Sequence, residues 1–472
     1  MNRIPRLLLV VTSLLLALAR GNAVVINEIM YHSAAVPENT AQEWIELYND
    51  SPTATVVLTG WKFTKGVDFT FPNGTTLLPG GYIVIAANVA AFQAAHPGFA
   101  GQLVGGWVGT LTNSSEHLVL VDAALVTMAD LHFSNEGDWG LRGRGPLLLT
   151  HRGWAWFSDA SGGGKTIELR NPALAQFDCG QNWGVSAAVG GSPGGVNSVV
   201  SANVAPLIKD VKHKPDVPHS TEAVQVSCNL HDEGAGATAA LHWRLDGAGA
   251  FNTLAMSDTN GDGDVEATIP AQANLAIVEY YVSATDGVNA RTWPAPARTS
   301  DIGVVTETFG QVTNALYLVD NSFDANAAFQ AAGSQPIYRM IMTAAERAEL
   351  LQIQTNSGQA DSDAAMNATF ISHDGTGVKV RHLTGLRNRG TGSRLGPPNN
   401  YHLGFRNDDD WEGRGSLQFN CRYPHSQALG ALCFDLAGVA SQDSAPVRVR
   451  VNGVDLAEAG LRMYGRYQCV GK

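Results

Sequence analysis

The sequence predicts a mainly β protein, in which two β-sandwiches are followed by a smaller region of mixed helices and strands. Short segments of alternating apolar and polar residues recur along the chain, and turn residues such as Asn73-Gly74 separate them. Charged residues make up only 16% of the 472 residues, whereas glycine is abundant at 51. A chain of this length is too long for one hydrophobic core, so we expect two to four domains.

The first 23 residues are typical of an export signal. Arg3 and Arg6 precede an apolar run, Leu7–Leu18, and the small residues Gly21 and Ala23 fit a cleavage site. The run is shorter than the roughly 20 residues of a membrane span, although an uncleaved anchor is the alternative. We therefore expect a secreted or cell-envelope protein with no transmembrane segment after cleavage.

Net charge and cysteine content exclude some classes of partner and site. The net charge of −12 argues against a nucleic-acid partner, because binding to a phosphate backbone needs a basic face. The few cysteines form no CxxC or zinc-ligand pattern, so we expect small buried thiols, with one pairing, Cys421 to Cys433, left open. They are Cys179, Cys228, Cys421, Cys433 and Cys469.

Residues 24–200 form the first predicted module. Val24–Met30, Trp44–Tyr48 and later segments alternate with a period of two, as strands do. The motifs INEIMYHS, EWIELYND, LTGWKFTKG, FTFPNGTTLLPGGYIVIA, GTLTNSSEHLVLVD and IELRNP…NWG…GSPGGVN occur in this order, and the module resembles a bacterial lamin-tail domain. The resemblance implies an immunoglobulin-like sandwich with a binding or spacing role. The insertion between Trp139 and Gly164 has no place in this pattern.

Glu28, Glu43 and Glu46 raise the question of whether this module carries chemistry. Paired carboxylates can serve as acid and base or can hold a metal. No histidine pair or third acid recurs at ligand spacing, and the glutamates alternate with strand residues. We therefore interpret them as architectural, on solvated strand faces or in edge hydrogen bonds.

Residues 204–304 form the second module and resemble an immunoglobulin or fibronectin type III-like domain, with Trp243 as a core aromatic. Within it, DTNGDGDVEATI matches the front half of a calcium loop. Its candidate ligands are Asp258, Asn260, Asp262 and Asp264, with Glu266 at position nine. Position twelve is Ile269 instead of a bidentate glutamate, and a metal-free hairpin turn explains the same residues.

The third region, residues 336–472, opens with a helix that Thr343 caps, with Glu346 completing a capping box. The segment RNRGTGSR, the strand NNYHLGF, a helix around Leu429–Ala440 and the turn Asn452-Gly453 resemble the front part of the spore-coat protein H (CotH) kinase family. This implies a kinase-like fold that uses ATP and magnesium. Arg387, Arg389 and Arg394 are candidate phosphate ligands, or they belong to a tight turn.

The region matches only the front of that family, whose magnesium-binding acids come from its later part. The nearby acids Asp408–Asp410 are expected to be solvated surface. We therefore expect a truncated kinase-like region without catalytic residues. The predicted function is non-catalytic binding or spacing outside the cytoplasm, toward an unknown protein or polysaccharide. The alternative is a CotH-type ATP-dependent protein kinase whose C-terminal part is missing.

Overall fold

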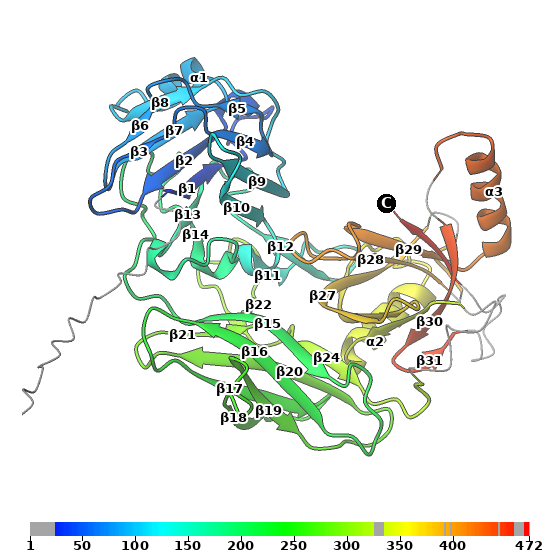
Figure 1. The fold of residues 1–472 in the computed structure, drawn as a ribbon. Helices are drawn as coiled ribbons and strands as arrows, with labels where there is room; N and C mark the ends of the chain where they lie inside the picture. Colours follow the sequence, from blue (N-terminus) through cyan, green and yellow to red (C-terminus); the bar gives the residue numbers. More distant parts are fainter. Residues whose placement is uncertain are drawn as a thin grey trace, which may run out of the picture.

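The structure is a computed structural model that describes residues 24–324, 335–390, 393–396, 399–441, 444–456 and, for the backbone, 467–471. The predicted export signal lies outside these residues. Three modules meet at a central junction (Figure 1), and strands dominate all of them. The mainly β prediction is confirmed.

The first module is a sandwich of two sheets. One sheet has the strand order β14-β13-β1-β2-β7-β8 and the other β10-β9-β4-β5. Apolar residues of both inner faces form its core, including Trp61, Phe63 and Leu118. The strands and helix are β1 (Val24–Met30), β2 (Trp44–Asn49), β3 (Val56–Val57), β4 (Lys62–Lys65), β5 (Phe69–Thr70), β6 (Thr76–Leu77), β7 (Tyr82–Ala86), α1 (Val89–Ala95), β8 (Gln102–Gly105), β9 (Ser115–Val121), β10 (Thr127–Ser134), β13 (Ile167–Leu169) and β14 (Trp183–Val185).

The insertion that the sequence left unplaced forms a separate hairpin. Its strands are β11 (Leu141–Arg144) and β12 (Trp154–Phe157), which pair antiparallel. β11 also pairs in parallel with β22 (Ala297–Arg298), which in turn pairs with β23 (Phe309–Gly310). The hairpin therefore leaves the first sandwich and joins a small sheet with two strands from a late segment of the second module.

The second module is a sandwich of a three-stranded sheet, β15-β16-β19, and a larger sheet, β18-β17-β20-β21. Its core contains Tyr280 and Trp293, while Trp243 packs against the edge of the core. β24, beyond the predicted end at residue 304, pairs with β20. The strands are β15 (Leu207–Lys214), β16 (Val224–His231), β17 (Thr238–Leu245), β18 (Asn252–Met256), β19 (Asp264–Ile269), β20 (Ile277–Thr285), β21 (Ala290–Trp293) and β24 (Ala315–Leu318).

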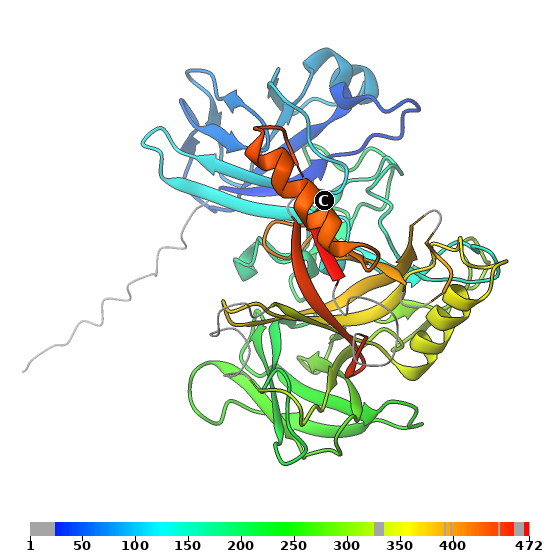
Figure 2. The same cartoon turned by 90° about the vertical axis from the view of Figure 1, so that its right-hand side faces the viewer.

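The third module is a β-sheet that closes on itself. Its order is β25-β26-β27-β28-β29-β32-β30-β31, and a parallel pairing of β25 with β30 closes the ring. In Figure 2 these strands, yellow to red, lie above the green second module. The elements are β25 (Ile337–Ile341), α2 (Ala344–Thr355), β26 (Met366–His373), β27 (Val378–Arg389), β28 (Asn400–Gly404), β29 (Ser416–Asn420), α3 (Pro424–Leu436), β30 (Ser444–Val451), β31 (Val454–Asp455) and β32 (Tyr467–Gly471).

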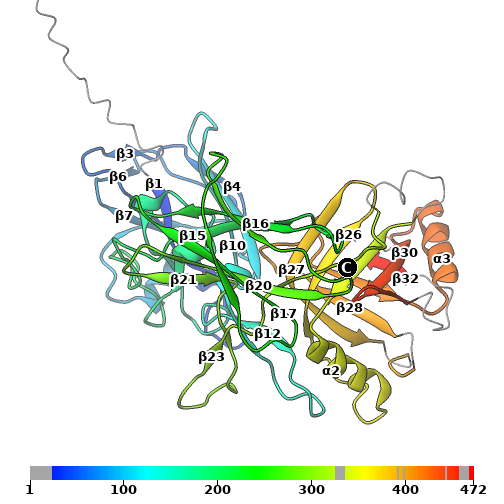
Figure 3. The same ribbon diagram turned by 90° about the horizontal axis from the view of Figure 1, so that it is seen from below.

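This closed sheet has its own core and does not show the kinase-like α+β arrangement that the resemblance implied. Phe370, Leu403 and Phe419 are among its fully buried side chains. The exposed apolar surface of the module lies instead on α3, at the outer edge of the molecule (Figures 1 and 3), where Leu432 and Phe434 are exposed. α3 begins and ends earlier than the predicted helix around Leu429–Ala440.

Several local predictions can be compared with the structure. Thr343 caps α2 by accepting a hydrogen bond from the Glu346 N–H, but the Glu346 side chain turns elsewhere, so the capping box is incomplete. Asn452 and Gly453 both have positive φ, as the predicted turn between β30 and β31 requires. Cys421 and Cys433 are free thiols, so the open pairing is not formed. No helix within the described ranges is long and apolar enough to cross a membrane.

Candidate functional site

The loop between β18 and β19 brings three carboxylates together. One oxygen each of Asp258, Asp262 and Glu266 lies within 4.8 Å of the others. The Asp258 carboxylate accepts hydrogen bonds from the N–H groups of Gly261 and Gly263, at 2.6 and 3.1 Å. The loop is thus wrapped around one carboxylate, and two further carboxylates complete a group of oxygen atoms.

Asp264, also a predicted ligand, lies outside this group. Its carboxylate pairs with Lys212 Nζ at 2.8 Å and accepts a hydrogen bond from Asn229 Nδ2 at 3.3 Å. The hydrogen bond from Lys212 is the main reason that the pKa of Asp264 is lowered. Glu266, buried on β19, therefore takes the place that the prediction gave to Asp264.

The chemistry of this group suits a hard cation such as calcium, which prefers oxygen ligands. The fourth predicted ligand, Asn260, donates from Nδ2 to Asp262 Oδ2 at 3.0 Å, so its amide holds the loop. Ile269, at position twelve, is fully buried in the core of the module and offers no oxygen from its side chain. β18 and β19 belong to opposite sheets, but Ser257 and Glu266 pair antiparallel at the base of the loop and exchange two backbone hydrogen bonds of 3.1 Å, so the metal-free hairpin turn stays an alternative. The residues could hold calcium weakly.

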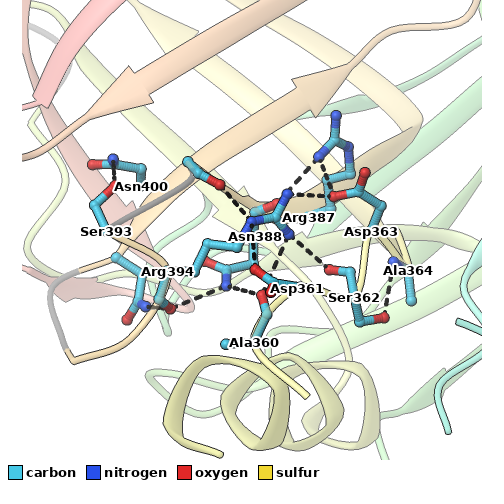
Figure 4. Close-up of polar contacts among 12 residues, drawn as sticks. Ala360, Asp361, Ser362, Asp363, Ala364, Arg387, Asn388, Ser393, Arg394 and Asn400 are labelled. Atoms are coloured by element: carbon cyan, nitrogen blue, oxygen red, sulfur yellow. Dashed lines mark hydrogen bonds and ion pairs between the residues drawn. The ribbon is translucent and has the colours of Figure 1, made fainter. Parts of the chain in front are cut away.

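Two of the predicted phosphate-binding arginines, Arg387 at the end of β27 and Arg394 in the segment that follows, lie together (Figure 4), and acids already neutralise both of them. Arg387 and Arg394 each donate to Asp363 Oδ1 at 2.8 Å. Arg394 also lies 3.6 Å from Asp361 and donates to the carbonyl of Ser362 at 3.3 Å. These contacts hold the segment after α2 against the closed sheet of the third module.

Arg389 is the third member of this cluster, and it donates a hydrogen bond to Asn420 Oδ1. Burial lowers its pKa, and the positive charges of Arg387 and Arg394 lower it further. No carboxylate of the described chain lies within ion-pair distance of Arg389. The structure therefore brings the three predicted arginines together, but it leaves only Arg389 without an acid.

Glutamates on adjacent strands of the first module form a buried ladder. Glu28 on β1 stands opposite Glu46 on β2 and Glu168 on β13, and all three are fully buried. Backbone N–H groups of Ser192 and Gly194 donate to Glu28 and Glu46. Burial raises the pKa of Glu28 to about 8 and that of Glu46 to about 7. The expected solvated strand faces are wrong, because a loop covers these glutamates and uses them as acceptors.

Glu43 has a similar role at the other end of β2. Its Oε2 accepts a hydrogen bond from the Leu111 N–H at 2.8 Å, while Oε1 has no partner within the described chain. Burial raises the pKa of Glu43 to about 7. This carboxyl group therefore holds a loop against the core and resists ionisation.

The junction of the three modules was missed by sequence reasoning. The hairpin β11–β12 reaches the third module, where Arg142 NH1 donates to the Leu383 carbonyl at 2.6 Å. Trp154 Nε1 donates to Glu346 Oε1 at 2.7 Å, and its backbone N–H donates to the Ala365 carbonyl at 2.7 Å. The one signal in the sequence was the pair Trp154 and Trp156 within the insertion, because a solvated loop has no need of large apolar side chains.

Asp408, in the acidic cluster Asp408–Asp410, also belongs to this junction, so the expectation of solvated surface is wrong for it, whereas Asp410 is exposed as expected. Asp408 Oδ2 accepts a hydrogen bond from the Asp138 N–H of the first module at 3.2 Å, and its Oδ1 lies 3.2 Å from Arg406 Nε of its own module. The neighbouring Asn407 N–H donates to Glu136 at 3.0 Å. Backbone N–H groups therefore join the first and third modules here, and the ion pair with Arg406 holds Asp408 in place.

Histidines join the second module to the third. His213 Nδ1 and His382 Nε2 lie 3.1 and 3.2 Å from the Tyr280 hydroxyl, and Thr369 Oγ1 lies 3.0 Å from His382 Nδ1. Burial lowers the pKa of His213 to about 4 and that of His382 well below its usual value. Both imidazoles are therefore neutral when the second and third modules are in contact.

Comparison with known proteins gives a family match for the first module and similarities to solved structures. Residues 18–134 match the family model of the Lamin Tail Domain, which supports the prediction for the first module. No curated protein matches the chain. A solved structure of a GH family 64 laminaripentaose-producing beta-1,3-glucanase from Paenibacillus barengoltzii is 14% identical, over 45% of this chain and 58% of that one, with a TM-score of 0.14. At this TM-score the likeness supports no conclusion about fold or activity.

Proposed function

We propose that the protein is exported and acts without catalysis, as a rigid scaffold that presents binding surfaces at the cell envelope or outside the cell. The lamin-tail match and the mainly β architecture support a binding or structural role. The ligand class that we propose is an extracellular protein or polysaccharide. The hairpin β11–β12 is the observation that carries the scaffold part of the proposal.

This hairpin contacts both the second and the third module. Gly143 on β11 pairs with Arg298, which lies between β21 and β24 of the second module, and Arg142 donates into β27 of the third. Arg142 is only 5% exposed, so its charge is removed from water at the junction. Buried charged hydrogen bonds are costly to leave unmade, which favours one fixed arrangement of the modules over flexible linkage.

Calcium is part of this proposal only as a weak ligand of the loop at Asp258, Asp262 and Glu266. Bound there, the ion would neutralise three carboxylates that lie close together. Its role would be to stiffen the connection between the two sheets of the second module, not to activate a substrate. No proposed step of the function depends on it.

Small-angle scattering tests the scaffold. The segment Val24–Lys472 should have the dimensions of one rigid body, and Arg142→Ala combined with Trp154→Ala should increase its maximum dimension. Arg422→Ala, at an exposed arginine of the third module, is the control and should change nothing. Wild-type protein as extended as the double variant would refute the rigid arrangement.

The alternative, a CotH-type protein kinase whose C-terminal part is missing, is tested with labelled ATP and both magnesium and manganese. We expect no turnover above a no-enzyme control, since Asp363 neutralises Arg387 and Arg394. Steady turnover that disappears in Arg389→Ala would replace the scaffold proposal with the kinase alternative.

A further inference from the structure

A cavity of about 490 Å³ lies between the first and second modules, and an arginine from each module lines it. Arg170 follows β13 of the first module, and Arg291 belongs to β21 of the second. Arg170 also lines an adjoining cavity of about 440 Å³. This volume is typical of small-molecule sites. Neither arginine belongs to the arginine cluster or to the hairpin contacts.

Both arginines lack an acidic partner. No carboxylate of the described chain lies within ion-pair distance of either one. One guanidinium nitrogen of each arginine donates hydrogen bonds to neutral oxygen atoms. Arg170 Nε donates to the Trp183 carbonyl at 2.8 Å, and Arg291 NH1 donates to the carbonyl and side chain of Gln181 at 3.1 and 3.2 Å. Arg291 Nε is buried without a partner. Several N–H donors therefore remain for a ligand.

The electrostatics of the cavity favour an anion. Burial lowers the pKa of Arg170. Burial is also the largest cause that lowers the pKa of Arg291, and the positive charge of Arg170 lowers it further. Two half-buried cations that repel each other and form no ion pair are unfavourable, and a bound anion would relieve both the repulsion and the unpaired donors.

Two acids face the same region and limit the charge of that anion. Asp138 lines the cavity and accepts a hydrogen bond from Gln181 at 2.9 Å; burial raises its pKa. Glu233 is occupied by the Asn171 side chain at 2.6 Å and the Val204 N–H at 3.0 Å. Both would repel a doubly charged phosphate more than a singly charged group.

We propose that this cavity binds a saccharide that carries a singly charged oxyanion, either a carboxylate or a sulfate ester. A guanidinium fork matches such a group with two parallel hydrogen bonds. Ser201, Asn203 and Asn289 also line the cavity and hydrogen-bond to one another, with Ser201 Oγ donating to the Asn203 carbonyl at 2.6 Å and Asn289 Nδ2 to Asn203 Oδ1 at 2.9 Å. Their neutral polar groups suit sugar hydroxyls, which would share or replace these hydrogen bonds. The inference rests on the proposed binding function and names its ligand class.

The test uses sugars that share one ring and differ only at carbon six. Isothermal titration calorimetry on Val24–Lys472 compares galacturonate, galactose 6-sulfate and galactose, with acetate as the isolated oxyanion. Arg170→Gln and Arg291→Gln remove the charges, and Arg422→Gln removes an exposed arginine elsewhere. Thermal melting checks that each variant folds. Arg170→Lys and Arg291→Lys keep the charge but lose the fork, and they replace any glutamine variant that does not fold.

We expect at least one charged sugar to bind, at least tenfold more tightly than galactose. Each glutamine variant should weaken binding at least tenfold and each lysine variant several-fold, whereas Arg422→Gln should not. Preference for galacturonate or for galactose 6-sulfate would identify the oxyanion. Equal binding of galactose, acetate as tight as the charged sugars, no effect of the variants, or no binding at all would overturn the proposal. Rigid scattering dimensions together with no binding would refute this inference alone and leave the scaffold standing.

Discussion

Replacing Glu43 by glutamine should stabilise the first module at alkaline pH and leave its stability in acid almost unchanged. Glu43 is fully buried, and burial raises its pKa from 4.5 to about 7. The pKa of Glu43 is higher in the folded than in the unfolded chain, so folding favours its protonated form. The contribution of protonated Glu43 to the free energy of unfolding is therefore complete below pH 4.5 and is lost as the pH rises through 7.

The size of the effect follows from this shift in pKa. The difference between 7 and 4.5 corresponds to about 3.5 kcal/mol of folding free energy, at about 1.4 kcal/mol for each pH unit. Glutamine cannot ionise, and its carbonyl can still accept the hydrogen bond from Leu111. Part of the wild-type loss has already occurred at pH 5, so the variant should gain about 2.5 kcal/mol relative to wild type between pH 5 and pH 8, or roughly 5–10 °C in melting temperature.

Thermal melting at pH 5 and pH 8 measures this gain, and hydrogen exchange of peptides from residues 24–134 assigns it to the first module. Glu222→Gln is the matched control, because Glu222 is an exposed glutamate of the second module. A difference between Glu43→Gln and wild type that is the same at both pH values would refute the reasoning. It would show that Glu43 is ionised in the folded protein at no cost.

Three further predictions concern export, calcium and acid. Terminal sequencing of the exported protein should begin at Val24, and an intact Met1 would support an anchor instead. Millimolar calcium should raise the melting temperature slightly, in proportion to occupancy; Asp258→Asn should abolish the rise and Asp264→Asn should not, whereas equal loss in both would contradict the ligand assignment. Acid should loosen the contact between the second and third modules, because burial depresses the pKa of His213 and stability is lost as the pH falls below 6.5. Limited proteolysis at pH 7 and pH 5 measures this, and unchanged cleavage would contradict it.

The strands of the first module could be predicted because their signal is local. Alternation within Val24–Met30 and the turn residues between strands do not depend on distant parts of the chain. The burial of Glu28 could not be predicted in the same way. The loop that covers it lies more than 160 residues away, since Ser192 supplies its hydrogen bonds. Alternation alone therefore suggested a solvated face where the structure has a covered one.

The calcium loop shows how spacing rules succeed in part. Asp258 and Asp262 converge as positions one and five of the motif predict. Asp264 stands at position seven, where calcium loops offer a backbone carbonyl, so its side chain is free to pair with Lys212. Glu266, at position nine of the same motif, supplies the third carboxylate instead.

The hairpin β11–β12 lay beyond sequence reasoning, because its partners are remote and of no special type. Arg142 binds a backbone carbonyl 241 residues further along the chain, and any residue could supply such an acceptor. The same holds for Arg170 and Arg291. Only their arrangement in space, and not their spacing, reveals that they share a cavity in which neither arginine has a described carboxylate within ion-pair distance.

The closure of the third module by β25 and β30 has a consequence for the order of assembly. These strands are more than 100 residues apart, and β32, which completes the ring, comes later still. During synthesis the first two sandwiches can form while the ring is still open, since non-local pairing is slow and must wait for the last strands. Arg142 and Trp154 would then remain exposed until the third module folds, so the chain has a late stage at which it is prone to aggregate and at which a chaperone would act.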